Sequence, residues 1–185
     1  RLILVSGASY GADNSEYRTE VDSFVKVKAF GSAGNGPSYF KVWTKEGLTM
    51  EFGNTTDSKV EAQGKASARV WALNKLQDTS GNYLTVTYTE DSANGDYRPN
   101  RIDYTNNTGL APGRSVQFFY ETRTDNYPAY VGGSVIKNMQ RLINVKTYLG
   151  ATLVKNYKVI YQYGTATKRS RVTSAASGGG ERARI

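Results

Sequence analysis

Apolar and polar residues alternate along much of the chain, with the period of two that is typical of β-strands. The alternation is clearest in residues 71–88, where a short polar segment separates two alternating ones. In the first segment Trp71, Leu73 and Lys75 would share one side of a strand. Residues 71–88 therefore predict a β-hairpin. No nucleophile stands beside a general base in it, so we expect its role to be strand pairing and aromatic packing.

The turn of this hairpin has the pattern Asp-x-x-Gly-Asn, with Asp78, Gly81 and Asn82 at the fixed positions. Gly81 or Asn82 can adopt a positive φ at low energetic cost, and the Asp78 carboxylate can accept hydrogen bonds from turn amides. These three residues are the predicted turn motif.

Further strands are predicted at intervals of about ten residues, as in an antiparallel meander. Gly47 and Gly150 mark the turns of two more hairpins. Residues 54–67 predict a loop with at most a short strand, and we predict no helix. The expected strands are 2–5, 20–30, 39–44, 48–53, 71–77, 83–88, 98–106, 115–123, 140–148, 152–163 and 169–174.

The length of 185 residues suits one domain, or one module of a larger β assembly. Its 19 glycines and 14 tyrosines, with many Thr and Val residues, favour strands over helices. The predicted fold class is all-β, with stacked antiparallel β-hairpins in an open sheet, a meander or a partial shell. We expect residues 1–177 to form this module and residues 178–185 to form a flexible glycine-rich tail. The start at Arg1 suggests a segment of a longer polypeptide.

Missing residue types limit the chemistry. The sequence has no cysteine and no histidine, which excludes disulfides, thiolate metal sites and the commonest general base. The net charge of +8 would suit an anionic partner, but the Lys and Arg residues are dispersed, as on a solvated surface. We therefore expect no cofactor, no bound metal and no nucleic-acid partner. No apolar run approaches the roughly 20 residues that span a bilayer, so no transmembrane segment is expected.

Acidic residues supply the main candidates for catalysis. Glu20 lies near Asp22, and Asp78 is followed by Glu90 and Asp91. A hydrolytic pair must face one cleft at about 5–10 Å, which spacing along a strand does not show. Solvated or lysine-paired carboxylates are the simpler interpretation, so we expect no enzymatic activity. A carboxylate hydrolase is the least favoured hypothesis.

The loop of Asp91, Asn94, Gly95 and Asp96 offers oxygen ligands for calcium, but it lacks the EF-hand spacing and the distal glutamate. A polar turn is the preferred interpretation. Arg123 with Asp125 predicts a polar network at a strand end.

The aromatic residues Trp43, Trp71, Tyr83 and Tyr88 predict packing, because hairpins with little helix need bulky rings to build a core. Such rings could instead form a sugar-stacking platform or, with Lys and Arg, a surface for single-stranded nucleic acid. An extracellular carbohydrate-binding β domain is therefore the alternative function.

A series of short motifs runs in order through nearly the whole chain. The motifs are Tyr17-Arg18-Thr19-Glu20, Phe40-Lys41-Val42-Trp43, Gly47, Phe52-Gly53, Trp71-Ala72-Leu73, Asp78-x-x-Gly81-Asn82-Tyr83, Ile102-Asp103-Tyr104-Thr105, Phe118-x-Tyr120-Glu121-x-Arg123-x-Asp125, Arg141-Leu142 and Tyr157-x-x-x-Tyr161. The series resembles the bacterial Rhs/YD-repeat proteins. It is most similar to the region shared by the Salmonella virulence plasmid B protein and the B component of insecticidal Tc toxins.

This resemblance implies β-hairpins that stack into a hollow shell around a cytotoxic polypeptide, in a protein that is secreted or exported to the cell surface. It implies that Asp78, Gly81 and Asn82 form the repeat turn and that Trp71 and Tyr83, together with Tyr88, are packing residues. No catalytic residue is carried over, because the resemblance includes neither the ADP-ribosylating part nor the self-cleaving aspartates. Only one clear repeat unit is present.

Together these observations predict a non-enzymatic structural module. Its expected partners are flanking segments of the same polypeptide, an encapsulated toxin segment, and a second copy that pairs through open strand edges.

Overall fold

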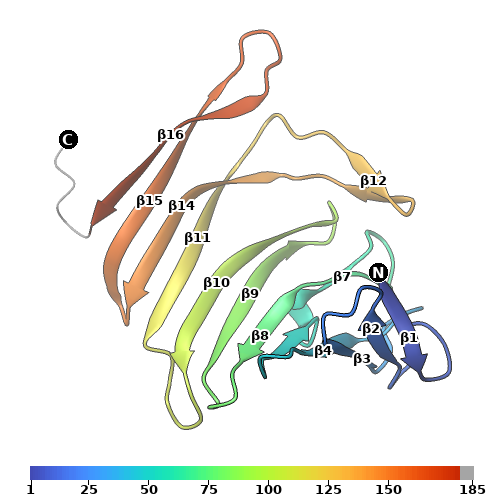
Figure 1. Cartoon of the computed structure of the whole chain (residues 1–185). Helices are drawn as coiled ribbons and strands as arrows, with labels where there is room; N and C mark the ends of the chain where they lie inside the picture. Colours follow the sequence, from blue (N-terminus) through green and yellow to red (C-terminus); the bar gives the residue numbers. More distant parts are fainter. Residues whose placement is uncertain (180–185) are drawn as a thin grey trace.

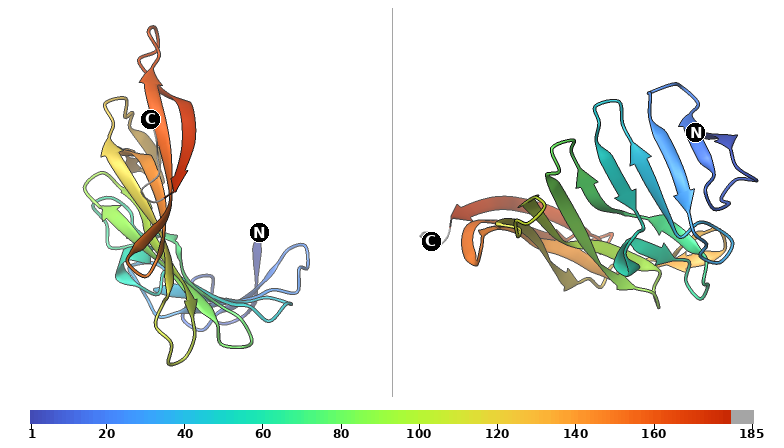
Figure 2. Two further views of the ribbon diagram at one scale, coloured as in Figure 1. Left: turned by 90° about the vertical axis from the view of Figure 1, so that its left-hand side faces the viewer. Right: turned by 90° about the horizontal axis from the view of Figure 1, so that it is seen from below.

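The computed structural model describes residues 1–179, which form sixteen β-strands and one three-residue 3-10 turn. Twelve of the strands make a single antiparallel sheet, which confirms the all-β prediction. In their order across the sheet they are β1 (Leu2–Ser6), β2 (Glu16–Thr19), β3 (Lys26–Phe30), β4 (Tyr39–Trp43), β5 (Thr49–Phe52), β8 (Leu73–Gln77), β9 (Tyr83–Asp91), β10 (Asp96–Asn106), β11 (Arg114–Thr122), β14 (Gln140–Leu149), β15 (Thr152–Tyr163) and β16 (Ser170–Gly179). The sheet is open, with β1 and β16 at its edges, and it is strongly curved (Figures 1 and 2).

Two small hairpins accompany the large sheet. The first pairs β6 (Lys59–Glu61) with β7 (Ala68–Trp71), and the 3-10 turn η1 (Thr56–Ser58) precedes it. The second pairs β12 (Ala129–Val131) with β13 (Ser134–Ile136) and forms an arm that reaches towards the β9–β10 turn, where the Lys137 N–H donates to the Asn94 carbonyl at 2.8 Å (Figure 1). Each hairpin lies in the connection between two neighbouring strands of the large sheet. The strand numbers therefore skip from β5 to β8 and from β11 to β14, but the neighbouring strands remain antiparallel.

The strand register divides the side chains between two faces of different chemistry. Residues paired directly across an antiparallel ladder point to the same side of the sheet. We call the side on which paired positions are mainly apolar the apolar face. Its paired rows are Val27–Val42–Met50–Leu76–Leu84, Val86–Ile102–Val116 and Phe118–Val145–Tyr157.

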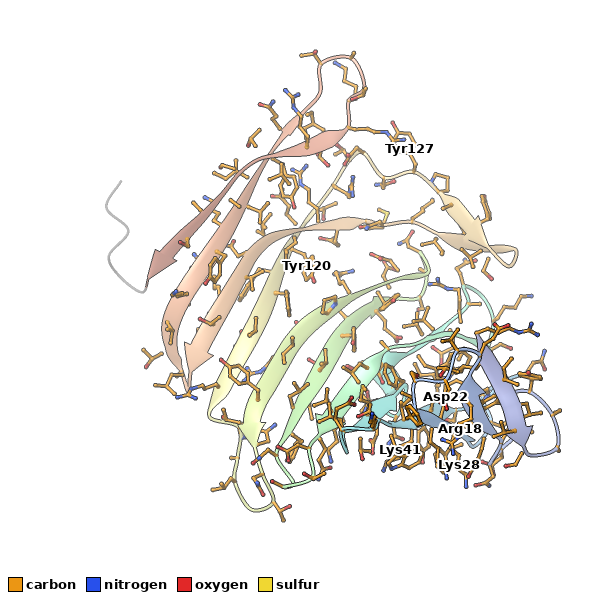
Figure 3. The ribbon with its side chains drawn as sticks, in the orientation of Figure 1. Arg18, Asp22, Lys28, Lys41, Tyr120 and Tyr127 are labelled. Carbon is orange, nitrogen blue, oxygen red and sulfur yellow. The ribbon has the colours of Figure 1, made fainter. Side chains whose placement is uncertain are left out.

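The opposite side carries lysines, and we call its β2–β9 part the cationic face. One row of paired positions there is Glu16–Lys28–Lys41–Glu51–Lys75, and the next is Lys26–Trp43–Thr49–Gln77–Tyr83. Lys28 and Lys41, labelled in Figure 3, come from neighbouring strands on this face.

Little of the apolar face is fully covered. The buried apolar residues are Tyr17, Val27, Ala29, Val60, Ala72 and Val86. A globular monomer of 20.3 kDa would expose roughly 8,800 Å², whereas this chain exposes 11342 Å². The excess follows from the architecture, because an open sheet without a full second layer leaves side chains bare. Near the β16 edge, Tyr157 on the apolar face and Val172 on β16 itself are exposed, and so are Val154 and Ile160 on the opposite side of β15.

The predicted hairpins at Gly47 and Gly150 are confirmed, and both glycines have positive φ, at 83° and 56°. The prediction of a continuous strand over 20–30 is wrong, because β3 begins only at Lys26. Residues before it form a loop in which the Asp22 carboxylate accepts a hydrogen bond from the Phe24 N–H at 2.8 Å. Such a local side-chain bond competes with strand pairing.

The strand predicted to start at Trp71 is divided. Trp71 ends β7, and β8 starts at Leu73. The intervening Ala72 donates its N–H to the Ser58 carbonyl and accepts a hydrogen bond from the Gly53 N–H, so its backbone bonds are made outside both ladders.

At the end of the chain, β16 continues through Gly179 and so takes in the first two residues of the tail predicted for 178–185. The rest of that predicted tail, residues 180–185, lies outside the described residues.

Candidate functional site

The Asp78 turn between β8 and β9 has the geometry that its sequence predicts. Asp78 Oδ1 accepts hydrogen bonds from the N–H groups of Ser80 and Asn82 at 2.9 and 2.8 Å, and Oδ2 accepts one from the Asn82 side chain at 2.8 Å. Gly81 has a φ of 81°. The hydrogen bond from the Asn82 side chain, with those from the turn amides, lowers the pKa of Asp78. The motif closes the β8–β9 hairpin, and the Asp78 carboxylate is occupied by hydrogen bonds within the turn.

A second loop docks on this turn. The Asn107 side chain, which follows β10, donates to Asn82 Oδ1 at 2.7 Å and to the Ser80 carbonyl at 3.4 Å. No sequence motif singles out Asn107 as a contact of this turn. The turn signal in Asn107-Thr108-Gly109 marks a bend there, but it does not indicate that the bend meets the Asp78 turn.

Trp71 and Tyr88 lie on the apolar side of the sheet. The Trp71 ring packs edge-on against Phe40, with ring centroids 5.1 Å apart, and its indole N–H donates to the Pro37 carbonyl at 3.0 Å. The Tyr88 hydroxyl donates to the Leu73 carbonyl at 2.8 Å, and burial raises its pKa. Both polar tips are therefore engaged by protein groups, as expected for packing residues.

Trp43 and Tyr83 lie on the cationic face, opposite Trp71 and Tyr88. The Nζ atoms of Lys26 and Lys41 lie 5.6 and 6.0 Å from the Trp43 ring centroid, and Lys75 Nζ lies 4.6 Å from the Tyr83 ring. The two tryptophans thus belong to different faces and do not form a common platform. The sequence predicts alternation, but it does not tell which face a loop or hairpin will cover.

The predicted Arg123–Asp125 network is present and includes a third residue. Arg123 binds the Asp125 carboxylate through Nε and Nη2 at 2.9 and 2.8 Å, and the N–H of Ser170 donates to the same carboxylate at 2.6 Å. These contacts hold the pKa of Asp125 well below its usual range, with the Arg123 hydrogen bonds as the largest cause. The network ties the segment after β11 to the beginning of β16.

A pocket of about 320 Å³ adjoins this network. Arg98 lies 5.4 Å from the Tyr120 ring, labelled in Figure 3, and the Arg141 Nε donates to Glu121 at 2.7 Å. The lining residues are Asp96, Tyr97, Arg98, Pro99, Tyr120, Arg123, Asn138, Gln140, Arg141 and Leu142. Arg98, Arg123 and Arg141 each have a carboxylate partner, so the charges here are largely balanced within the protein.

The acidic residues singled out from the sequence are dispersed. Glu20 and Asp22 lie in the loop between β2 and β3, whereas Asp78 lies in the turn before β9 and Glu90 and Asp91 end that strand. Burial, with the nearby carboxylates of Glu61 and Asp57, raises the pKa of Glu90. A strand of nine residues spans about 30 Å, which excludes a hydrolytic pair between Asp78 and Asp91.

The loop considered for calcium is an ordinary polar turn, in which the Asn94 side chain donates to Asp91 at 2.8 Å. Within residues 1–179 no group of three or more acidic side chains is placed to hold a metal ion. None of the described helices is long and apolar enough to cross a membrane.

These features define a class of protein domain by its fold: an open, curved, antiparallel sheet whose apolar face and edge strands are incompletely covered. The same fold occurs in the N-terminal domain of the effector protein SpvB from Salmonella typhimurium, with a TM-score of 0.75 and 12% sequence identity over 89% of this chain and 68% of that one. It occurs also in the Tc holotoxin pore from Photorhabdus luminescens, with a TM-score of 0.71 and 14% identity over 85% of this chain. The structure of TcdB2-TccC3 gives a TM-score of 0.68 and 13% identity over 94% of this chain.

The chain spans about two thirds of the SpvB domain but only 10% and 13% of the two Tc chains. No family model matches the sequence, and no curated protein matches it. The structural likeness nevertheless confirms, at the level of the domain fold, the resemblance to the region shared by SpvB and Tc toxin components.

Proposed function

We propose that this chain is a toxin-related structural module, whose sheet forms part of a wall that encloses or delivers a toxic polypeptide. The observation that carries the proposal is the incompletely covered sheet, with an apolar face of paired rows and two open edges. The shared fold with SpvB and Tc toxin components supports it. The module acts without catalysing a reaction, in keeping with the dispersed acidic residues.

The mechanism is enclosure by continuation of the sheet. An edge strand presents unpaired N–H and C=O groups that another strand can take up, and β16 is such an edge. The exposed apolar side chains beside it are about half exposed and would each gain about 1 kcal/mol on full burial. Flanking segments of the same polypeptide are the proposed source of the added strands, and the enclosed toxin segment is the proposed cargo.

The proposed location is outside the producing cell or on its surface. This part of the proposal rests on the resemblance to exported Rhs/YD-repeat and Tc proteins and on the fold shared with an effector protein and a holotoxin.

Amide hydrogen exchange tests the proposal. Outward-facing amides of β16 should exchange fast in the 185-residue chain at dilutions where it is monomeric, and at least about a hundredfold more slowly in the complete native polypeptide, where added strands would bond them. Residues 83–85 of the central strand β9 are the internal control, because they are paired with both β8 and β10 and should be slow in both samples. Equally fast exchange of the β16 amides in the complete polypeptide would overturn the proposal.

A further inference from the structure

The cationic face contains a like-charge pair that folding alone does not explain. Lys28 and Lys41 occupy directly paired positions of β3 and β4. Like charges at such positions are destabilising. The same row continues through Glu51 on β5 to a third lysine, Lys75 on β8.

Carboxylates neutralise only part of this charge. Lys26 forms an ion pair with Glu16 at 2.9 Å, and Lys41 forms one with Glu51 at 3.2 Å. Within residues 1–179, Lys28 and Lys75 have no carboxylate within ion-pair distance, so the face keeps a positive excess.

Aromatic rings hold the ammonium groups in place. Lys28 Nζ lies 5.4 Å from the ring centroid of Phe30, which stacks on Tyr39 at 4.9 Å with an angle of 10° between the planes. Together with the lysine contacts of Trp43 and Tyr83, this gives each of the four lysines a ring contact. Cation–π contact restrains the lysine side chain, so less conformational entropy is lost when an anion binds.

The same geometry discriminates between kinds of anionic polymer. Single-stranded nucleic acid binds such surfaces by stacking its bases on bare aromatic faces. Here ammonium groups lie over the rings of Trp43 and Tyr83, so base stacking would require their displacement. A polymer that presents charges without aromatic bases needs no such displacement.

We propose that the cationic face binds an acidic polysaccharide, with the ammonium groups of Lys28, Lys41 and Lys75 contacting successive sulfate or carboxylate groups. From β3 to β8 the row crosses three inter-strand spacings, or about 14 Å. The ring edges beside the lysines would contact the apolar sides of the sugars. This function is separate from enclosure, because it uses the face opposite the apolar rows.

The test compares two double variants of equal charge. Lys28→Gln/Lys41→Gln removes two charges from the cationic face, and Lys65→Gln/Lys155→Gln removes two exposed lysines from outside the β2–β9 face. Circular dichroism checks the folding of both, and the single variant Lys75→Gln replaces the first if that one does not fold. The probe is a heparin-derived octasaccharide, titrated calorimetrically at several salt concentrations.

The expected result is binding by the unchanged chain that weakens about tenfold in Lys28→Gln/Lys41→Gln, with the slope of log K against log salt reduced by about 2. The Lys65→Gln/Lys155→Gln control should lose less than about half of the affinity. A galacturonate oligomer of equal length distinguishes carboxylate from sulfate as the recognised group. Three outcomes would each overturn the proposal: no octasaccharide binding by the unchanged chain, equal weakening in the two double variants, or tighter binding of an oligothymidylate.

Discussion

Asp125 and Ser170 are 45 positions apart in the sequence, and the Asp125 carboxylate accepts hydrogen bonds from both the backbone N–H and the hydroxyl of Ser170, at 2.6 and 2.8 Å. Since Ser170 is the first residue of β16, this contact fixes the position at which the edge strand begins.

Substitution Asp125→Ala should release the start of β16. The Asp125 side chain is only 2% exposed, so its removal leaves Arg123 and the Ser170 N–H without their partner, at an expected loss of about 3 kcal/mol in the free energy of unfolding. Urea denaturation measures the loss, and hydrogen exchange at residues 170–172 locates it.

Asp103→Ala is the matched control. Asp103 also binds an arginine two positions earlier, Arg101, at 2.7 Å, but its side chain is 18% exposed and the pair lies within one strand. The free energy of unfolding should fall by less than about 1 kcal/mol in Asp103→Ala. Equal losses in the two variants would contradict the special role of Asp125.

Acid should weaken the same contact. The folded-state pKa of Asp125 lies below its ordinary value of 3.8, so its stabilising effect is complete above that value and is lost as the pH falls further. Stability measured between about pH 5 and pH 2 should therefore decline less steeply in Asp125→Asn than in the unchanged chain. Parallel pH profiles would show that another carboxylate dominates acid unfolding.

Gly81→Ala should destabilise the Asp78 turn by about 1 kcal/mol, because an L side chain is disfavoured at the φ of 81° found there. Thermal unfolding measures the change. Gly36→Ala is the control, since Gly36 does not have a positive φ and an added Cβ would lie 3.6 Å from the Trp71 ring, an ordinary contact. Equal thermal stability of the Gly81→Ala and Gly36→Ala variants would contradict the prediction that the turn requires a glycine at this φ.

The two tryptophans should differ in their effect on stability. Trp71→Ala removes a ring packed on Phe40 and should lower the free energy of unfolding by about 3 kcal/mol. Trp43→Ala removes a ring whose described contacts include two lysines and should cost about 1 kcal/mol. Chemical denaturation of the two variants tests this order, and the reverse order would show that the apolar face does not contain the main packing.

The isolated chain should self-associate through its open edges. Light scattering over a range of concentrations should show dimers or larger species, and Val172→Lys on β16 should reduce them, because a lysine on an edge strand opposes edge pairing. Leu110→Lys, at an exposed position in the loop between the central strands β10 and β11, should leave association unchanged. A chain that stays monomeric at every concentration would contradict the prediction.

Local chemistry accounts for the parts of the fold that the sequence predicts well. The turns at Gly47, Asp78 and Gly150 are specified by residues within a few positions of one another, and the hairpins follow from them. The loop before Lys26 was missed because its alternating residues suit a strand, while the hydrogen bonds that end the strand come from Asp22 and Thr19 side chains.

Long-range contacts account for what the sequence does not predict. Trp43 and Trp71 both lie in alternating segments, and only the packing of Phe40 against Trp71 assigns them to opposite faces. Asp125 follows β11 and Ser170 begins β16, so the β12–β13 arm and the strands β14 and β15 lie between them in the sequence. No local sequence pattern therefore indicates their contact.

The paired rows of the sheet restrict how the length of this chain can vary among related sequences. A single residue inserted or deleted before Lys41 in β4, and not absorbed by a β-bulge, would move Lys41 and Trp43 to the apolar side and Val42 to the cationic side, whereas a change of two residues would preserve both faces. Insertions in the loops between strands do not change the face on which strand residues lie. At the Gly132-Gly133 tip of the β12–β13 arm, where an added Cβ would meet no atom within 4 Å, the chain should tolerate short insertions of either odd or even length.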